Sequence, residues 1–186
     1  MKSIKHLLTA AFAFVAFSAM AQQDFSAPQY ARYGDTPEQR KRNIEYLNFL
    51  KESVSSKDYN AAAYYYQQIS SDRPKVSVNI YKYAAIVYRN KIARSQSLDE
   101  QKVMIDSLLG VYDLRLEHFG NAAKEGAAYI LDTKTRDVMK YKRNDIGAIR
   151  DAFNAALEVG GEATEPDLIV LYFTKLCDVY MNSDEV

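Results

Sequence analysis

Apolar side chains along much of this chain return at steps of three and four residues, which is the spacing of one face of a helix. The clearest example is the segment 37–55, whose apolar positions are Ile44, Leu47, Phe49, Leu50 and Val54. Thr36 can cap this segment, Pro37 suits a first helical position, and Gln39 lies at the distance of a capping box. The pattern predicts a helix that begins at Pro37 and ends near Ser55.

The same periodicity predicts six further helices, separated by turns rich in polar residues, glycine or proline. Their expected ranges are 59–70, 79–95, 98–119, 123–141, 146–159 and 167–181. Because the turns are short and each helix has an apolar stripe, consecutive helices must pack antiparallel. The sequence therefore predicts an all-α fold of stacked antiparallel helical hairpins, with about seven helices in total.

Residues 1–21 are left out of this fold because they have the pattern of a secretion signal. Two lysines precede a short apolar run over 7–17, and the small-x-small sequence over 19–21 suits a signal peptidase. We expect cleavage before Gln22 and export of the mature chain. The apolar run is too short for a comfortable permanent anchor, so we expect no membrane span after cleavage.

Large and small side chains also recur at a fixed interval along the chain. The aligned pairs, 34 residues apart, are Tyr46 with Ile80, Phe49 with Tyr83, Leu50 with Ala84 and Ser53 with Val87. In the second helix Ala62 precedes Tyr66 by four residues and Pro74 follows, and Ile149 precedes Phe153 in the same way. This pattern resembles the tetratricopeptide repeat (TPR) family, in particular its secreted, divergent members in Gram-negative bacteria.

The resemblance implies a repeat domain over 36–186, preceded by a lead-in over 22–35 that we expect to be flexible. Its helical hairpins would span 37–74, 77–119 and 123–160, followed by one more first-type helix over 166–181. In that helix Val170, Phe173, Thr174 and Cys177 have the first-helix spacing. That spacing predicts that Cys177 fills the core. This helix is the first of a hairpin whose second helix is absent. It either caps the stack, pairs with another molecule or belongs to a longer stack, and we expect the longer stack.

Charge excludes one large class of partner. The chain has 24 Lys and Arg against 24 Asp and Glu, and its one short basic block is Arg40-Lys41-Arg42, which we interpret as a solvated helix side. Proteins that bind the phosphate backbone need a basic excess or a basic face. We therefore expect no nucleic-acid partner.

Catalytic groups are scarce in the sequence. Once the signal is removed, His118 is the one histidine and Cys177 the one cysteine, and no metal-ligand spacing or glycine-rich phosphate loop is present. Asp145, Asp151 and Glu158 fit a solvated helix face better than an acid–base pair. We therefore expect a protein that is not an enzyme and that needs no cofactor or metal.

Binding of a protein or peptide is the function that the resemblance implies, in the concave groove lined by first helices. The candidate partner-binding residues are Asn48, Lys51, Tyr81, Lys82, Tyr88 and Arg89. Two alternatives stay open: a module that binds glycans or small ligands through exposed tyrosines, and a structural part of an envelope assembly. The secretion signal predicts a periplasmic or secreted location in a Gram-negative bacterium, and the oligomeric state stays open.

Overall fold

The computed structural model describes residues 23–182, so the predicted secretion signal lies outside the described residues. Residues 23–182 form seven α-helices and two short 3-10 helices, and no strand occurs among them. The elements are η1 (Pro28–Tyr33), α2 (Pro37–Ser55), α3 (Tyr59–Asp72), α4 (Asn79–Arg94), α5 (Leu98–Phe119), α6 (Ala127–Tyr141), α7 (Ile146–Gly160), η2 (Gly161–Ala163) and α8 (Pro166–Asn182). The prediction of an all-α fold is confirmed.

The chain divides into two compact units, and the division falls inside α2, between Glu45 and Tyr46. The N-terminal unit holds η1 and the first turns of α2. In it the Arg40 side chain donates hydrogen bonds to the backbone carbonyls of Phe25, at 3.0 Å, and Gly34, at 2.9 Å. Arg40 therefore fastens the lead-in segment to α2, whereas the sequence had placed it on a solvated side.

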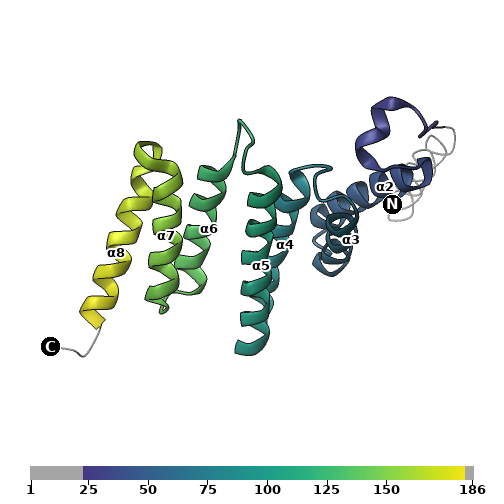
Figure 1. Ribbon diagram of the computed structural model, residues 1–186. Helices are drawn as coiled ribbons and strands as arrows, with labels where there is room; N and C mark the ends of the chain where they lie inside the picture. The colour runs from purple at the N-terminus through teal and green to yellow at the C-terminus, as the bar shows by residue number, and fades with distance from the viewer. Residues whose placement is uncertain (1–22, 183–186) are drawn as a thin grey trace, which may run out of the picture. The chain divides into compact units, whose positions relative to one another are not determined.

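In the second unit the helices pack in chain order, each against the next from α3 to α8 (Figure 1). The turns between them are short, so neighbouring helices run antiparallel and form stacked hairpins. Helix α8 contacts both α6 and α7. This order of contacts is the arrangement of helix pairs that the sequence predicts.

Local capping explains why the helices begin where they do. Ser97 accepts a hydrogen bond from the Glu100 backbone N–H at 3.1 Å, and the Glu100 carboxylate accepts one from the Gln96 N–H at 2.9 Å. This reciprocal pair is a capping box, and it starts α5 at Leu98 as the sequence predicts. Asp145 caps α7 in the simpler way, by accepting from the Ala148 N–H at 2.9 Å.

Helix α6 starts four residues later than the predicted position 123, because the turn before it is folded back on itself. The Ala127 N–H donates to the Gly120 carbonyl at 2.8 Å. A side chain at Gly126 would lie only 2.4 Å from the Ala122 carbonyl oxygen, so the close turn requires glycine there. The turn also places Glu125 in the left-handed region, at φ 54°.

Burial at the 34-residue positions agrees with the repeat pattern in the first two hairpins. Leu50 and Ala84 are fully buried, and so are Ile80 and Val87. The second-helix positions Ala62, Tyr66, Ile149 and Phe153 are buried as well. Five of the eight side chains aligned at 34 residues are therefore buried (Leu50, Ser53, Ile80, Ala84 and Val87), whereas Tyr46, Phe49 and Tyr83 are partly buried.

Two leucines of α5 test this division between core and surface. We predict that Leu108→Ala, at a fully buried position, lowers the free energy of unfolding by about 2–5 kcal/mol. Leu98→Ala, at an exposed position of the same helix, should change it by less than about 0.5 kcal/mol. Chemical denaturation of the two variants measures the difference, and equal effects would contradict the assigned core.

Candidate functional site

The structure separates the six predicted partner-binding residues into different environments. Asn48 and Lys51 are exposed on α2. Tyr81 and Tyr88 are only 1% and 7% exposed, so the expectation that they face a partner is wrong. Their rings lie edge-on to the ring of Tyr66 of α3, at 6.2 and 6.4 Å between centroids. These two tyrosines hold α4 against α3.

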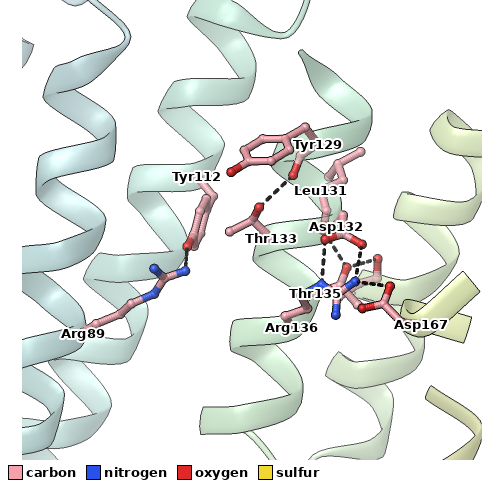
Figure 2. A network of polar contacts seen from close by, with 10 residues as sticks. Arg89, Tyr112, Tyr129, Leu131, Asp132, Thr133, Thr135, Arg136 and Asp167 are labelled. Atoms are coloured by element: carbon pink, nitrogen blue, oxygen red, sulfur yellow. Dashed lines mark hydrogen bonds and ion pairs between the residues drawn. The ribbon is translucent and has the colours of Figure 1, made fainter. Parts of the chain in front are cut away.

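Arg89 is engaged inside the protein. Its Nε lies 2.9 Å from Oδ2 of Asp137 on α6. Its Nη2 donates to the Tyr112 hydroxyl on α5 at 2.8 Å (Figure 2). Tyr112 in turn donates to Asp137 Oδ2 at 2.7 Å. Burial, followed by the Asp137 charge, raises the pKa of Tyr112, so its hydroxyl keeps the proton that it donates. The three side chains join α4, α5 and α6.

Lys82 takes part in a second ion cluster at the start of the next hairpin. Its Nζ lies 2.6 Å from Oε2 of Glu125, which also accepts from Nη2 of the buried Arg115 at 2.8 Å. The Lys82 hydrogen bond, with help from Arg115, holds the pKa of the Glu125 carboxyl below its ordinary value. The Arg115 guanidinium also lies 5.4 Å from the centre of the Tyr129 ring. Lys82 therefore anchors the turn before α6.

Helix α8 carries four exposed large apolar side chains, more than any other helix among residues 23–182: Val170, Phe173, Tyr180 and Met181. Val170 is 65% exposed and Phe173 is 58% exposed, and Thr174 and Cys177 beside them are also exposed. These four residues, which we call the α8 stripe, follow one another at helical spacing on one side of α8. The prediction that Cys177 fills the core is wrong, because no helix among residues 23–182 covers this side.

The other side of α8 is packed. Leu168 is fully buried, and the Tyr172 ring stacks on Phe153 of α7 at 3.9 Å between centroids. Arg136 of α6 bonds both Asp132 of its own helix and Asp167 of α8, at 2.7 and 2.8 Å (Figure 2). Helix α8 is therefore packed against α6 and α7 on one side, and its opposite side is also apolar.

The segment that contains α7 and α8 has an excess of acidic residues. Residues 146–182 contain six carboxylates against the two cations Arg150 and Lys175; the carboxylates are Asp151, Glu158, Glu162, Glu165, Asp167 and Asp178. All six are on exposed residues. Three of them are paired within the chain: Asp151 with Arg150, Asp167 with Arg136 and Asp178 with Lys175.

A separate cavity of about 630 Å³ lies between the beginning of α5 and the turn from α6 to α7. Its apolar walls include Leu98, Ile105 and Tyr141. Lys102 and Arg143 are among the polar residues that line it, and Lys142 beside them pairs with Asp106 at 3.5 Å. The volume lies in the range of small-molecule sites.

No group of three His, Cys, Asp or Glu side chains among residues 23–182 is placed to hold a metal ion. His118 lies on α5 beside the Tyr81 ring, at 6.3 Å between centroids. Across the same residues, no helix has the length and hydrophobicity needed to cross a bilayer.

Comparison with protein-family models, with curated proteins and with solved structures gives no significant match to the chain. The resemblance to the TPR family therefore stays a prediction from the sequence spacing.

The polar network around Asp137 predicts a large loss of stability when this carboxylate is removed. Asp137→Ala leaves the buried Tyr112 hydroxyl without its acceptor and Arg89 without its counter-charge, so we expect a loss of about 2–4 kcal/mol. The matched control is Asp113→Ala, which breaks an exposed pair with Lys134 and should cost at most about 1 kcal/mol. Urea denaturation compares the variants, and a loss at Asp137 as small as at Asp113 would rule out a structural role for the network.

Proposed function

We propose that this chain is a non-catalytic protein-interaction scaffold of the bacterial cell envelope, built from helix pairs of the TPR type. The observation that supports it best is the α8 stripe, an exposed apolar helix side next to a packed one. Contiguous apolar surface on a folded protein commonly marks a site where another molecule binds. The envelope location rests on the predicted secretion signal.

The spacing of the α8 stripe favours a protein partner over a small ligand. Its apolar residues recur at three- and four-residue steps along about two turns of helix, which suits an amphipathic helix laid alongside. The interaction surface that we propose therefore differs from the groove predicted from the sequence. Tyr81, Tyr88, Lys82 and Arg89 are engaged in internal contacts, and Asn48 and Lys51 remain as exposed positions of the original set.

Small-ligand binding is a second candidate function, and the cavity beside Tyr141 favours it. Tyr141, Lys102 and Arg143 all line this cavity, and an aromatic ring together with cations suits a ligand with a flat face and a negative charge, such as an acidic sugar. The exposed tyrosines expected from the sequence include Tyr64, Tyr129 and Tyr180, which lie on the separate helices α3, α6 and α8.

Affinity capture from envelope extract tests the proposal. The mature protein should retain a protein in stoichiometric amount, and Phe173→Asp should abolish its retention, because a carboxylate on the α8 stripe has to be desolvated on binding. Val103→Asp, at an exposed position of α5, is the matched control and should leave capture unchanged. Capture that is equal for the two variants would exclude the α8 stripe, and a retained oligosaccharide in place of a protein would favour the second candidate.

A further inference from the structure

We propose that a polar cavity in the second unit binds a phosphate group, a small tetrahedral oxyanion with two negative charges. The cavity has a volume of about 250 Å³ and lies where the turn from α2 to α3 meets the end of α4 and the beginning of α5. Three cations line it, Lys57, Lys91 and Arg94, which we call the cation triad. The site is separate from the α8 stripe and from the cavity beside Tyr141, so it goes beyond the proposed function.

The cation triad lacks a counter-charge at ion-pair distance. Among residues 23–182, none of its three side chains forms an ion pair with a carboxylate. Cations that join two elements elsewhere in the second unit do form such pairs, as Lys82 does with Glu125 and Arg136 does with Asp167. Positive charges that share one site are stabilised by an anion between them. For the triad, a bound anion can supply that charge.

Two cations of the triad are held in place by uncharged groups that also line the cavity. The Lys91 Nζ donates to Oδ1 of Asn60 at 2.7 Å. The guanidinium carbon of Arg94 lies 4.9 Å from the centre of the Tyr59 ring. An amide oxygen or a phenol ring fixes the position of a cation without cancelling its charge. Lys91 and Arg94 are therefore positioned and still carry charge for a ligand.

Lys57 is positioned by the backbone of the turn that follows α2. Its N–H donates to the Val54 carbonyl at 3.2 Å, and the Asp58 N–H donates to the Ser53 carbonyl at 2.9 Å. These two bonds form a Schellman motif, in which the residue with left-handed backbone is most often glycine. Lys57 occupies that position with φ 63°, a conformation that glycine adopts more easily. The turn thus carries a charged side chain where its backbone favours glycine.

Two carboxylates line the same cavity, and both accept hydrogen bonds at helix starts. Asp58 accepts from the Ala61 N–H at 3.1 Å, and Glu100 accepts from the Gln96 N–H at 2.9 Å. These bonds hold the two carboxylates at the beginnings of α3 and α5. With the three cations of the triad against these two carboxylates, the lining keeps a net positive charge.

The lining also indicates which kind of anion fits. Tyr59 is the one aromatic residue among the lining residues, and no aliphatic side chain is among them, so a ligand with a large apolar body would gain little. Arg94 can bond two oxygens of a phosphate group side by side, and the lysines can contact its other oxygens as point charges. Three cations at one small cavity suit a single phosphate group, whereas a nucleic-acid backbone needs an extended basic face.

Isothermal titration calorimetry of the mature protein with inorganic phosphate tests the site, at constant ionic strength and about pH 8, where phosphate is mostly doubly charged. We expect saturable binding that sulfate competes for, since sulfate has the same shape and charge. Perchlorate is tetrahedral with a single charge and should compete at least about fivefold less well. Glycerol phosphate identifies the source: tighter binding than inorganic phosphate would mean a phosphate ester, and equal or weaker binding would mean the free ion.

Variants of the triad locate the bound phosphate. Arg94→Gln and Lys57→Gly should each weaken binding at least about fivefold, because each removes one of the three cations. Lys57→Gly puts glycine on a left-handed backbone, so thermal unfolding should stay at or above that of the unaltered protein, which separates lost binding from lost folding. The matched control is Lys75→Gln, at an exposed cation in the turn from α3 to α4 that does not line the cavity, and it should bind phosphate normally.

Three results would overturn the proposal: no saturable binding of phosphate, equal competition by perchlorate and sulfate, or binding that Arg94→Gln and Lys57→Gly leave at the level of Lys75→Gln. The capture experiment judges the proposed function separately. Capture of a protein through Phe173 without any phosphate binding would leave the scaffold function standing and reject this site, and phosphate binding without capture would do the reverse.

Discussion

The structure of the second unit depends on one constraint, which is that each helix needs a neighbour for every apolar side that it carries. A helix in a stack of hairpins has at least two such sides, one for its own hairpin partner and one for the adjoining hairpin. Helix α4 satisfies both, with α3 on one side and α5 on the other. Helix α8 has α6 and α7 on one side, and its second apolar side is exposed. The exposed apolar side of α8, which α4 does not have, is the basis of the proposed function.

Polar contacts fix the register in which these apolar sides meet. The Arg89, Tyr112 and Asp137 network ties α4 and α5 to α6, and Thr135 ties α6 to α7. Each contact joins consecutive hairpins or the helices of one hairpin. A buried polar group is costly unless it is paired, so a shift of one helix turn between neighbours would leave several such groups unpaired. The polar contacts therefore specify the register of neighbouring helices, which apolar packing alone would leave less defined.

Much of the fold could be predicted from the sequence because the signals that define it are local. The capping box of Ser97 and Glu100 and the cap at Asp145 lie within four residues of the helix starts that they determine. The three- and four-residue spacing of apolar side chains predicts where the helices run. The start of α6 was missed because the bond between Ala127 and Gly120 depends on a folded turn that no local pattern indicates.

The candidate site was harder to predict because burial depends on neighbours. Tyr81 and Tyr88 were expected to be exposed, and only the position of Tyr66 on α3 reveals that they are covered. Arg89 and its acceptor Asp137 are 48 residues apart, a separation unrelated to the 34-residue interval. Cys177 has the residue spacing of a helix side that can pack against another helix, but it is exposed. The spacing identifies such a side and does not show whether a neighbouring helix covers it.

The claim that one side of α8 has no neighbour among residues 23–182 is tested most directly by amide hydrogen exchange of the free mature protein. A helix that is packed on one side opens locally more easily than one packed on two, so backbone amides of α8 should exchange at least tenfold faster than those of α6. Protection of α8 equal to that of α6 would contradict the account, because it would mean that the exposed stripe is already covered in solution.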